Sequence, residues 1–208
     1  MFEKTSTVSG FPMRAAVIAG SHRRDSQSGR VARFIAARCE LIGGEAPYLL
    51  DLGKTPLPLW DESPLVNDEL WDGVAEQLHA CDAVVIVTPE WGGMAPAALK
   101  NFFLLCAQGE LAHKPGCLVG VSASNGGSYP LAELRMSSYK NTHLCYIPEQ
   151  IIIRQVELRL HPGADNEAEG HLRARLDYAL GQLAAYAGAL AQVRASGRVD
   201  LARYPFGM

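Results

Sequence analysis

The stretch that decides the fold runs from residue 14 to residue 28: Arg14-Ala15-Ala16-Val17-Ile18-Ala19-Gly20-Ser21-His22-Arg23-Arg24-Asp25-Ser26-Gln27-Ser28. Residues 15–19 form a short, unbroken apolar run that Gly20 ends, which is typical of a buried parallel strand. From Val31 onward apolar residues recur at helical spacing, so the sequence predicts an amphipathic helix there. A loop that leads from a strand into a helix presents unpaired backbone N–H groups and the positive end of the helix dipole. With its serines and arginines, this loop suits a phosphate group.

An ordinary turn explains the same loop equally well. Ser26 or Ser28 can cap the helix, and the arginines can be hydrated, because serine favours the N-cap position whatever the function. Three other site types fit worse. The loop lacks the lysine-containing P-loop pattern, the three-glycine dinucleotide pattern and the serine elbow of hydrolases.

Composition narrows the class of protein. The chain has 208 residues, of which 48% are apolar and 20% are charged, and its formal net charge is -3. These values indicate one α/β domain and disfavour general nucleic-acid binding, which needs a strongly basic surface. The five cysteines are scattered through apolar segments without a paired motif. They are expected to be buried free thiols, as in the reducing cytoplasm.

The ends of the chain are expected to contribute little to the fold. Residues 1–12 are polar and are predicted to be a disordered extension, or to precede a start at Met13. The single domain is predicted over residues 13–195, with a C-terminal tail over residues 196–208. No apolar segment approaches the length that a bilayer requires, so we expect a cytoplasmic protein without membrane contact.

Strands and helices are expected to alternate five times. The strands are predicted within residues 15–19, 45–52, 82–88, 117–122 and 147–156. Helical spacing follows each of them, with Leu70, Trp71, Val74 and Leu78 expected to face inward in the second helix. Such alternation predicts a doubly wound, flavodoxin-like three-layer sandwich with a five-stranded parallel sheet of order 2-1-3-4-5. In that order the loops after strands one, three and four, all rich in Gly, Ser or Asn, lie side by side at the ligand-binding edge.

These three loops resemble those of a known family. Residues 20–28 are similar to the GSxRxxSxS/N loop of the NAD(P)H-dependent FMN reductases, which include quinone, chromate and azo-dye reductases. Residues 89–101 resemble that family's PEYNxSxPGxLKN segment, and residues 124–127 resemble its third, glycine-rich loop. The resemblance covers most of residues 13–190 and implies a flavodoxin-like fold and a homodimer or homotetramer. It also implies hydride transfer from NADPH or NADH through FMN to a small-molecule acceptor.

The resemblance also implies which residues bind the cofactor. The FMN phosphate would be held by Ser21, Arg23, Ser26, Ser28 and the backbone at Gln27. The isoalloxazine ring would be bordered by Pro89, Glu90, Trp91, Gly92 and Gly93. Its other edge would be approached by Ser124, Asn125, Gly126 and Gly127. No catalytic side chain is expected because the flavin carries the chemistry, and the histidines show no metal-binding spacing.

The ring-side loop departs from the family pattern. Trp91 replaces its Tyr, Gly92 its Asn, Met94 its Ser and Ala97 its second Gly. An indole can still stack on a flat ring, but Gly92 offers no side-chain contact. Two alternatives therefore stay open at this level: a flavodoxin-type electron carrier without enzymatic activity, and a flavin-free binding or sensor protein. The acceptor and the choice between NADPH and NADH are not decided by the sequence.

Overall fold

The computed structural model describes residues 12–62, 68–164 and 166–207. The extension predicted for residues 1–12 therefore lies outside the described residues, apart from Pro12. The described strands are β1 (Ala15–Ala19), β2 (Tyr48–Asp51), β3 (Ala83–Pro89), β4 (Pro115–Val121) and β5 (Cys145–Ile153). The described helices are α1 (Gln27–Gly43), α2 (Glu69–His79), α3 (Ala97–Leu105), α4 (Tyr129–Ser137) and α5 (Glu167–Ala195). None of these helices is long and apolar enough to cross a membrane.

The strands form one parallel sheet of order β2-β1-β3-β4-β5, which confirms the predicted topology. Strands β1, β3 and β4 are buried along their whole length. Because helices cover both faces of such a sheet, its central strands are apolar in unbroken runs rather than in alternation. Pro47 immediately precedes β2, which lies at an edge, so the missing N–H group of that proline costs the sheet no hydrogen bond.

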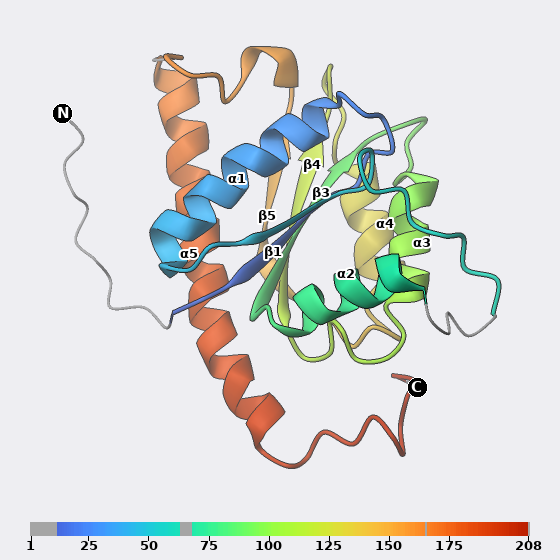
Figure 1. Ribbon diagram of the computed structural model, residues 1–208. Coiled ribbons are helices and arrows are strands. Elements are labelled where there is room, and N and C mark those ends of the chain that lie inside the picture. Colours follow the sequence, from blue (N-terminus) through green and yellow to red (C-terminus); the bar gives the residue numbers. More distant parts are fainter. Residues whose placement is uncertain (1–11, 63–67, 165, 208) are drawn as a thin grey trace.

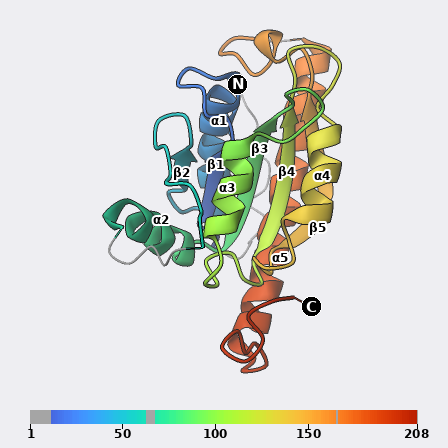
Figure 2. The same ribbon diagram turned by 90° about the vertical axis from the view of Figure 1, so that its right-hand side faces the viewer.

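Helices lie on both faces of the sheet, as Figures 1 and 2 show. On one face α1 and α5 pack against the sheet, and Ile35 and Leu180 belong to the same buried cluster as Val85. On the other face α2, α3 and α4 enclose a second cluster, in which Phe102 is fully buried beside the strands. The result is the expected three-layer sandwich.

Two details differ from the sequence prediction. Strand β5 was expected over residues 147–156, but it ends at Ile153, because Gln155 has a left-handed backbone with φ 50° and Val156 starts a 3-10 turn. Leu70, predicted to face inward, is 44% exposed. The buried stripe of α2 instead begins one residue later, at Trp71, and continues at spacings of three and four.

Candidate functional site

The loops after β1, β3, β4 and β5 leave the sheet at the same edge. The parallel register places Val121 opposite both Pro89 and Ile153. Beyond the strand, the Glu90 N–H continues the ladder by donating to Val121 O at 3.1 Å. Ligands of doubly wound sheets bind at this carboxyl edge. The structure thus brings together the loops that carry all the predicted binding residues.

Two of the predicted hydroxyl groups shape the first loop. Ser21 Oγ accepts a hydrogen bond from the Arg23 N–H at 3.2 Å, and Ser26 Oγ accepts one from the Gly29 N–H at 3.0 Å. Ser26 is therefore the N-cap of α1, in agreement with the ordinary-turn interpretation. Each hydroxyl still has its own proton to donate, so capping the helix does not remove Ser26 from a phosphate site.

The start of α1 carries donors that lack partners. In the described part of the chain, no hydrogen bond is made by the N–H groups of Gln27 and Ser28 or by the Ser28 hydroxyl, although Ser28 is only 1% exposed. The Gln27 side chain accepts from Arg30 Nε at 2.7 Å, which leaves the Gln27 backbone for a ligand. The first turn of α1 has no acidic residue. Unpaired donors at the positive end of a helix fit the phosphate of FMN.

The end of β2 supports this loop from beside it. Gly53 lies so close to the loop that a methyl group on it would come within 2.3 Å of Arg23 O. Asp51 Oδ1 holds the Gly53 N–H at 3.1 Å. Sequence reasoning missed Gly53, whose one signal was a glycine directly after a predicted strand. The Arg23 side chain itself is exposed and makes no ion pair with described residues.

The ring-side loop contains a tight two-residue turn. Trp91 and Met94 exchange both backbone hydrogen bonds at 3.1 Å. Between them, Gly92 and Gly93 have φ angles of 58° and 76°. Positive φ at both central positions defines a type I′ turn, in which glycine and asparagine are favoured. Gly92 therefore suits this backbone turn but offers no side-chain contact.

Glu90 joins the ring-side loop to the loop after β4. Its Oε2 accepts the Gly127 N–H at 2.6 Å. A methyl group on Gly126 would lie 2.7 Å from Glu90 Oε1, so a larger residue there would displace the Glu90 carboxylate. In the structure the Glu90 carboxylate thus faces Gly126 and Gly127, and its predicted role at the flavin ring stays a prediction.

An aromatic contact joins the first loop to the ring-side loop. The rings of His22 and Trp91 meet edge to face, with centroids 4.7 Å apart and planes inclined by 76°. Edge-to-face pairs of this kind are a favoured aromatic geometry. The partly exposed indole of Trp91 therefore contacts the loop that carries the phosphate donors.

Helix α4 fixes the far side of the turn. Glu133 Oε2 accepts the Ala95 N–H at 2.7 Å, and Glu133 also forms an ion pair with Lys100. Burial raises the pKa of Glu133, but hydrogen bonds from Lys100 and from the Ala95 N–H outweigh burial and leave the pKa lowered. Lys100 thus helps to position this carboxylate.

The loop after β4 is tied to the segment after β5. Ser124 O accepts the Gln155 N–H at 3.1 Å, while the Ser124 N–H donates to Ser122 Oγ at 3.1 Å. Asn125 is exposed. Nothing in the sequence singled out residues 154–160 as neighbours of the site, because they carry no motif.

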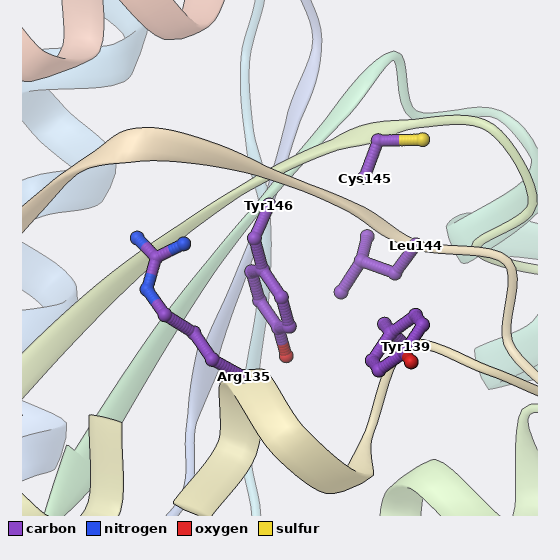
Figure 3. Close-up of a pocket in the computed structure, with 5 residues that line it drawn as sticks. All are labelled: Arg135, Tyr139, Leu144, Cys145 and Tyr146. Atoms are coloured by element: carbon purple, nitrogen blue, oxygen red, sulfur yellow. The ribbon is translucent and has the colours of Figure 1, made fainter. Parts of the chain in front are cut away.

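A cavity of about 320 Å³ lies away from these loops, between the end of α4 and the start of β5. Figure 3 shows its lining residues, which are Arg135, Tyr139, Leu144, Cys145 and Tyr146. Arg135 is occupied with structural contacts, since it donates to Ile147 O at 2.8 Å and to Gln150 Oε1 at 3.0 Å. Because strand β5 begins here, the cavity lies at the amino edge of the sheet, opposite the predicted site.

Comparison with known proteins identifies the family. Residues 13–157 match the sequence profile described as NADPH-dependent FMN reductase. The chain belongs to this family. It is 30% identical over 142 residues to an NADPH azoreductase from a Bacillus species, covering 68% of this chain and 76% of the relative. It is also 30% identical over 119 residues to a quinone reductase of Pseudomonas putida, covering 55% of this chain and 62% of that protein.

Solved structures support the fold. The flavoenzyme NAD(P)H:(acceptor) oxidoreductase FerB from Paracoccus denitrificans superposes with a TM-score of 0.66 at 18% identity, covering 85% of this chain and 98% of FerB. An apo NADH:FMN oxidoreductase, EMOB, superposes with a TM-score of 0.65 at 17% identity, covering 82% of this chain and 88% of that structure. Membership in the family makes FMN the cofactor and NAD(P)H the reductant.

Proposed function

We propose that this FMN reductase family member passes a hydride from NADPH or NADH to a quinone-like or other small electron acceptor. The observation that carries the proposal is the single edge at which unpaired donors of α1 meet the Trp91–Met94 turn, joined through His22. The names of the azoreductase and quinone reductase relatives support the acceptor class. For a quinone, one NAD(P)H and one proton yield NAD(P)⁺ and a hydroquinone.

The role proposed for the chain's own residues is to bind the cofactor and to hold the surrounding loops in position. FMN, when bound, supplies the redox chemistry by taking up and releasing the hydride. The Gln27 and Ser28 N–H groups, the loop hydroxyls and Arg23 would bind its phosphate. Glu90 and Glu133 keep the ring-side turn in place, and Trp91 offers a flat wall. We assign no acid or base to a side chain, because hydride delivery requires none.

We further infer a homodimer or homotetramer located in the cytoplasm. Leu104 of α3 and Met136 of α4 are 49% and 77% exposed, on the helices that cover one face of the sheet. Exposed apolar side chains on neighbouring helices favour contact with a second copy. The five cysteines are free, and four of them are buried, which suits a reducing compartment.

A spectrum of the purified protein tests the proposed function. We expect FMN to bind with a flavin absorbance band that NADPH or NADH bleaches anaerobically and that a quinone restores. A protein that takes up no FMN would instead be a flavin-free binding protein. A bound flavin that neither nucleotide bleaches would indicate an electron carrier.

The phosphate assignment has its own test. Replacing Arg23 with Ala should weaken FMN binding about tenfold, because hydrogen bonds to charged groups are among the stronger ones in proteins. The neighbouring exposed Arg24→Ala variant is the matched control and should bind FMN as the wild type does. Titration of flavin fluorescence measures both. Equal affinities in the two variants would contradict the assignment to Arg23.

A further inference from the structure

Residues 154–160, which follow β5, form a rim beside the site, above the carboxyl ends of the strands (Figure 1). The Val156 N–H donates to Ser122 O at 3.1 Å, which ties the rim to the loop after β4. From the opposite side Arg30 donates to Val156 O at 2.6 Å and to Leu160 O at 3.2 Å. The buried Glu169 accepts the Leu160 N–H at 2.9 Å. These hydrogen bonds hold the rim backbone, from which the side chains extend, in place.

Arg154, at the start of the rim, is tied to the loop after β4. Its Nε donates to Gly126 O at 3.3 Å, while its side chain is exposed. Among the described residues, its two terminal nitrogens have no hydrogen-bond partner and no carboxylate within ion-pair distance. The Arg154 guanidinium group, whose forked donors suit a phosphate, is thus oriented by one hydrogen bond and keeps its terminal nitrogens unpaired.

The surrounding charges leave Arg154 free for an anion. On its own segment the nearest charged residues in sequence are Glu157, which is exposed, and Arg159, which is half-buried. From the facing loop, Glu90 approaches Gly126, but its Oε2 is occupied by the Gly127 N–H. The hydrogen bond from the Gly127 N–H offsets part of the negative charge of Glu90, so its repulsion of an anion at Arg154 is reduced.

Arg154 follows β5, whereas the loop proposed to hold the FMN phosphate follows β1. Strand β5 is three positions from β1 in the sheet. At the usual separation of neighbouring strands, the ends of β1 and β5 are about 14 Å apart. The FMN phosphate already has the unpaired donors at the start of α1, so an anion at Arg154 would belong to another molecule. The reductant of this family, NADPH, carries a pyrophosphate and a 2′-phosphate.

We propose that Arg154 binds a phosphate group of the nicotinamide nucleotide and so determines its affinity. This proposal rests on the proposed function, since it takes NAD(P)H as the co-substrate. The two sources of phosphate differ in consequence. Contact with the 2′-phosphate selects NADPH over NADH, whereas contact with the pyrophosphate strengthens the binding of both nucleotides equally.

Calorimetric titration of the FMN-loaded protein tests the proposal without turnover. The probes are NADP⁺, NAD⁺ and adenosine 2′,5′-bisphosphate, applied to wild type, Arg154→Ala and Arg154→Lys. The matched control is Arg198→Ala, an exposed arginine in the segment after α5. We expect Arg154→Ala to weaken NADP⁺ binding about tenfold or more. Arg154→Lys should recover part of this loss, because lysine keeps the charge but not the fork. FMN affinity should be unchanged in all variants.

The outcomes separate the alternatives. A loss with NADP⁺ and the bisphosphate, but not with NAD⁺, supports the 2′-phosphate. An equal loss with NADP⁺ and NAD⁺ supports the pyrophosphate. Unchanged nucleotide affinities overturn the role of Arg154, as does weaker FMN binding, while NADPH oxidation by the wild type would still uphold the proposed function. If the wild type binds the nucleotides through Arg154 but never oxidises NADPH, only the proposed function fails.

Discussion

Gly53 shows how one residue without a side chain supports a binding loop. A methyl group there would lie 2.3 Å from Arg23 O and 2.7 Å from its carbonyl carbon. We expect Gly53→Ala to displace the first loop and to weaken FMN binding about tenfold, with an overpacking cost of about 1–3 kcal/mol in stability. Flavin fluorescence titration and urea unfolding measure the two effects.

Gly73 provides the matched control for this substitution. It lies on the exposed side of α2, and a methyl group there would meet no heavy atom within 4 Å. Gly73→Ala should stabilise the protein by about 0.5–1 kcal/mol through helix propensity and leave FMN affinity unchanged. If Gly53→Ala binds FMN as tightly as Gly73→Ala does, β2 does not support the phosphate loop as described.

At the same scale, the sequence predicted residue types better than residue contacts. Ser26 was assigned two competing roles, and the structure places its oxygen on the Gly29 N–H while leaving its proton available. Gly92 was recognised as a departure from the family, but its positive φ depends on the hydrogen bonds between Trp91 and Met94. Contacts such as that of Gly53 with Arg23 join segments far apart in the chain, and one sequence without relatives contains no signal for them.

Among the elements, α3 holds down the proline-rich segment after β2. The buried Asn101 donates from Nδ2 to Pro58 O at 2.8 Å and accepts the Trp60 N–H on Oδ1 at 2.8 Å. The Asn101 amide thus forms two backbone hydrogen bonds with this segment, as a neighbouring strand would in a sheet. The described part of this segment is therefore held against α3.

Removal of this amide should loosen the segment. Asn101→Ala leaves the Pro58 carbonyl and the Trp60 N–H without their partner, so we expect a loss of about 2 kcal/mol in unfolding free energy. Limited proteolysis should cut residues 54–62 faster. Asn141→Ala, at an exposed asparagine, is the control. Equal cleavage rates in the two variants would show that Asn101 does not restrain the segment.

The elements themselves were largely predictable because each strand is a short apolar run and each helix has an apolar stripe. The ends were not. Strand β5 ends at Ile153 rather than at residue 156, because Gln155 adopts a left-handed backbone. These boundaries depend on tertiary hydrogen bonds, such as that from the Gln155 N–H to Ser124 O, which local periodicity does not encode.

For the molecule as a whole, a buried lysine makes stability depend on pH. Lys114 is 4% exposed, and its ammonium group donates to Leu78 O at 2.5 Å and to His79 O at 3.1 Å. The carbonyl groups at the C-terminal end of a helix such as α2 stabilise a nearby cation. Burial nevertheless dominates and lowers the pKa of Lys114 from 10.5 to about 8.

The sign of the effect follows from proton binding. Between pH 8 and 10.5 the folded protein binds fewer protons at Lys114 than the unfolded chain does, so stability rises with pH over this window. Relative to Lys114→Met, which cannot titrate, the wild type should gain up to about 3 kcal/mol between pH 7.5 and pH 10.5. Urea unfolding at several pH values measures this difference, and Lys54→Met, at an exposed lysine, corrects for general effects of removing a charge. A difference between wild type and Lys114→Met that stays constant with pH would mean that Lys114 remains protonated in the fold.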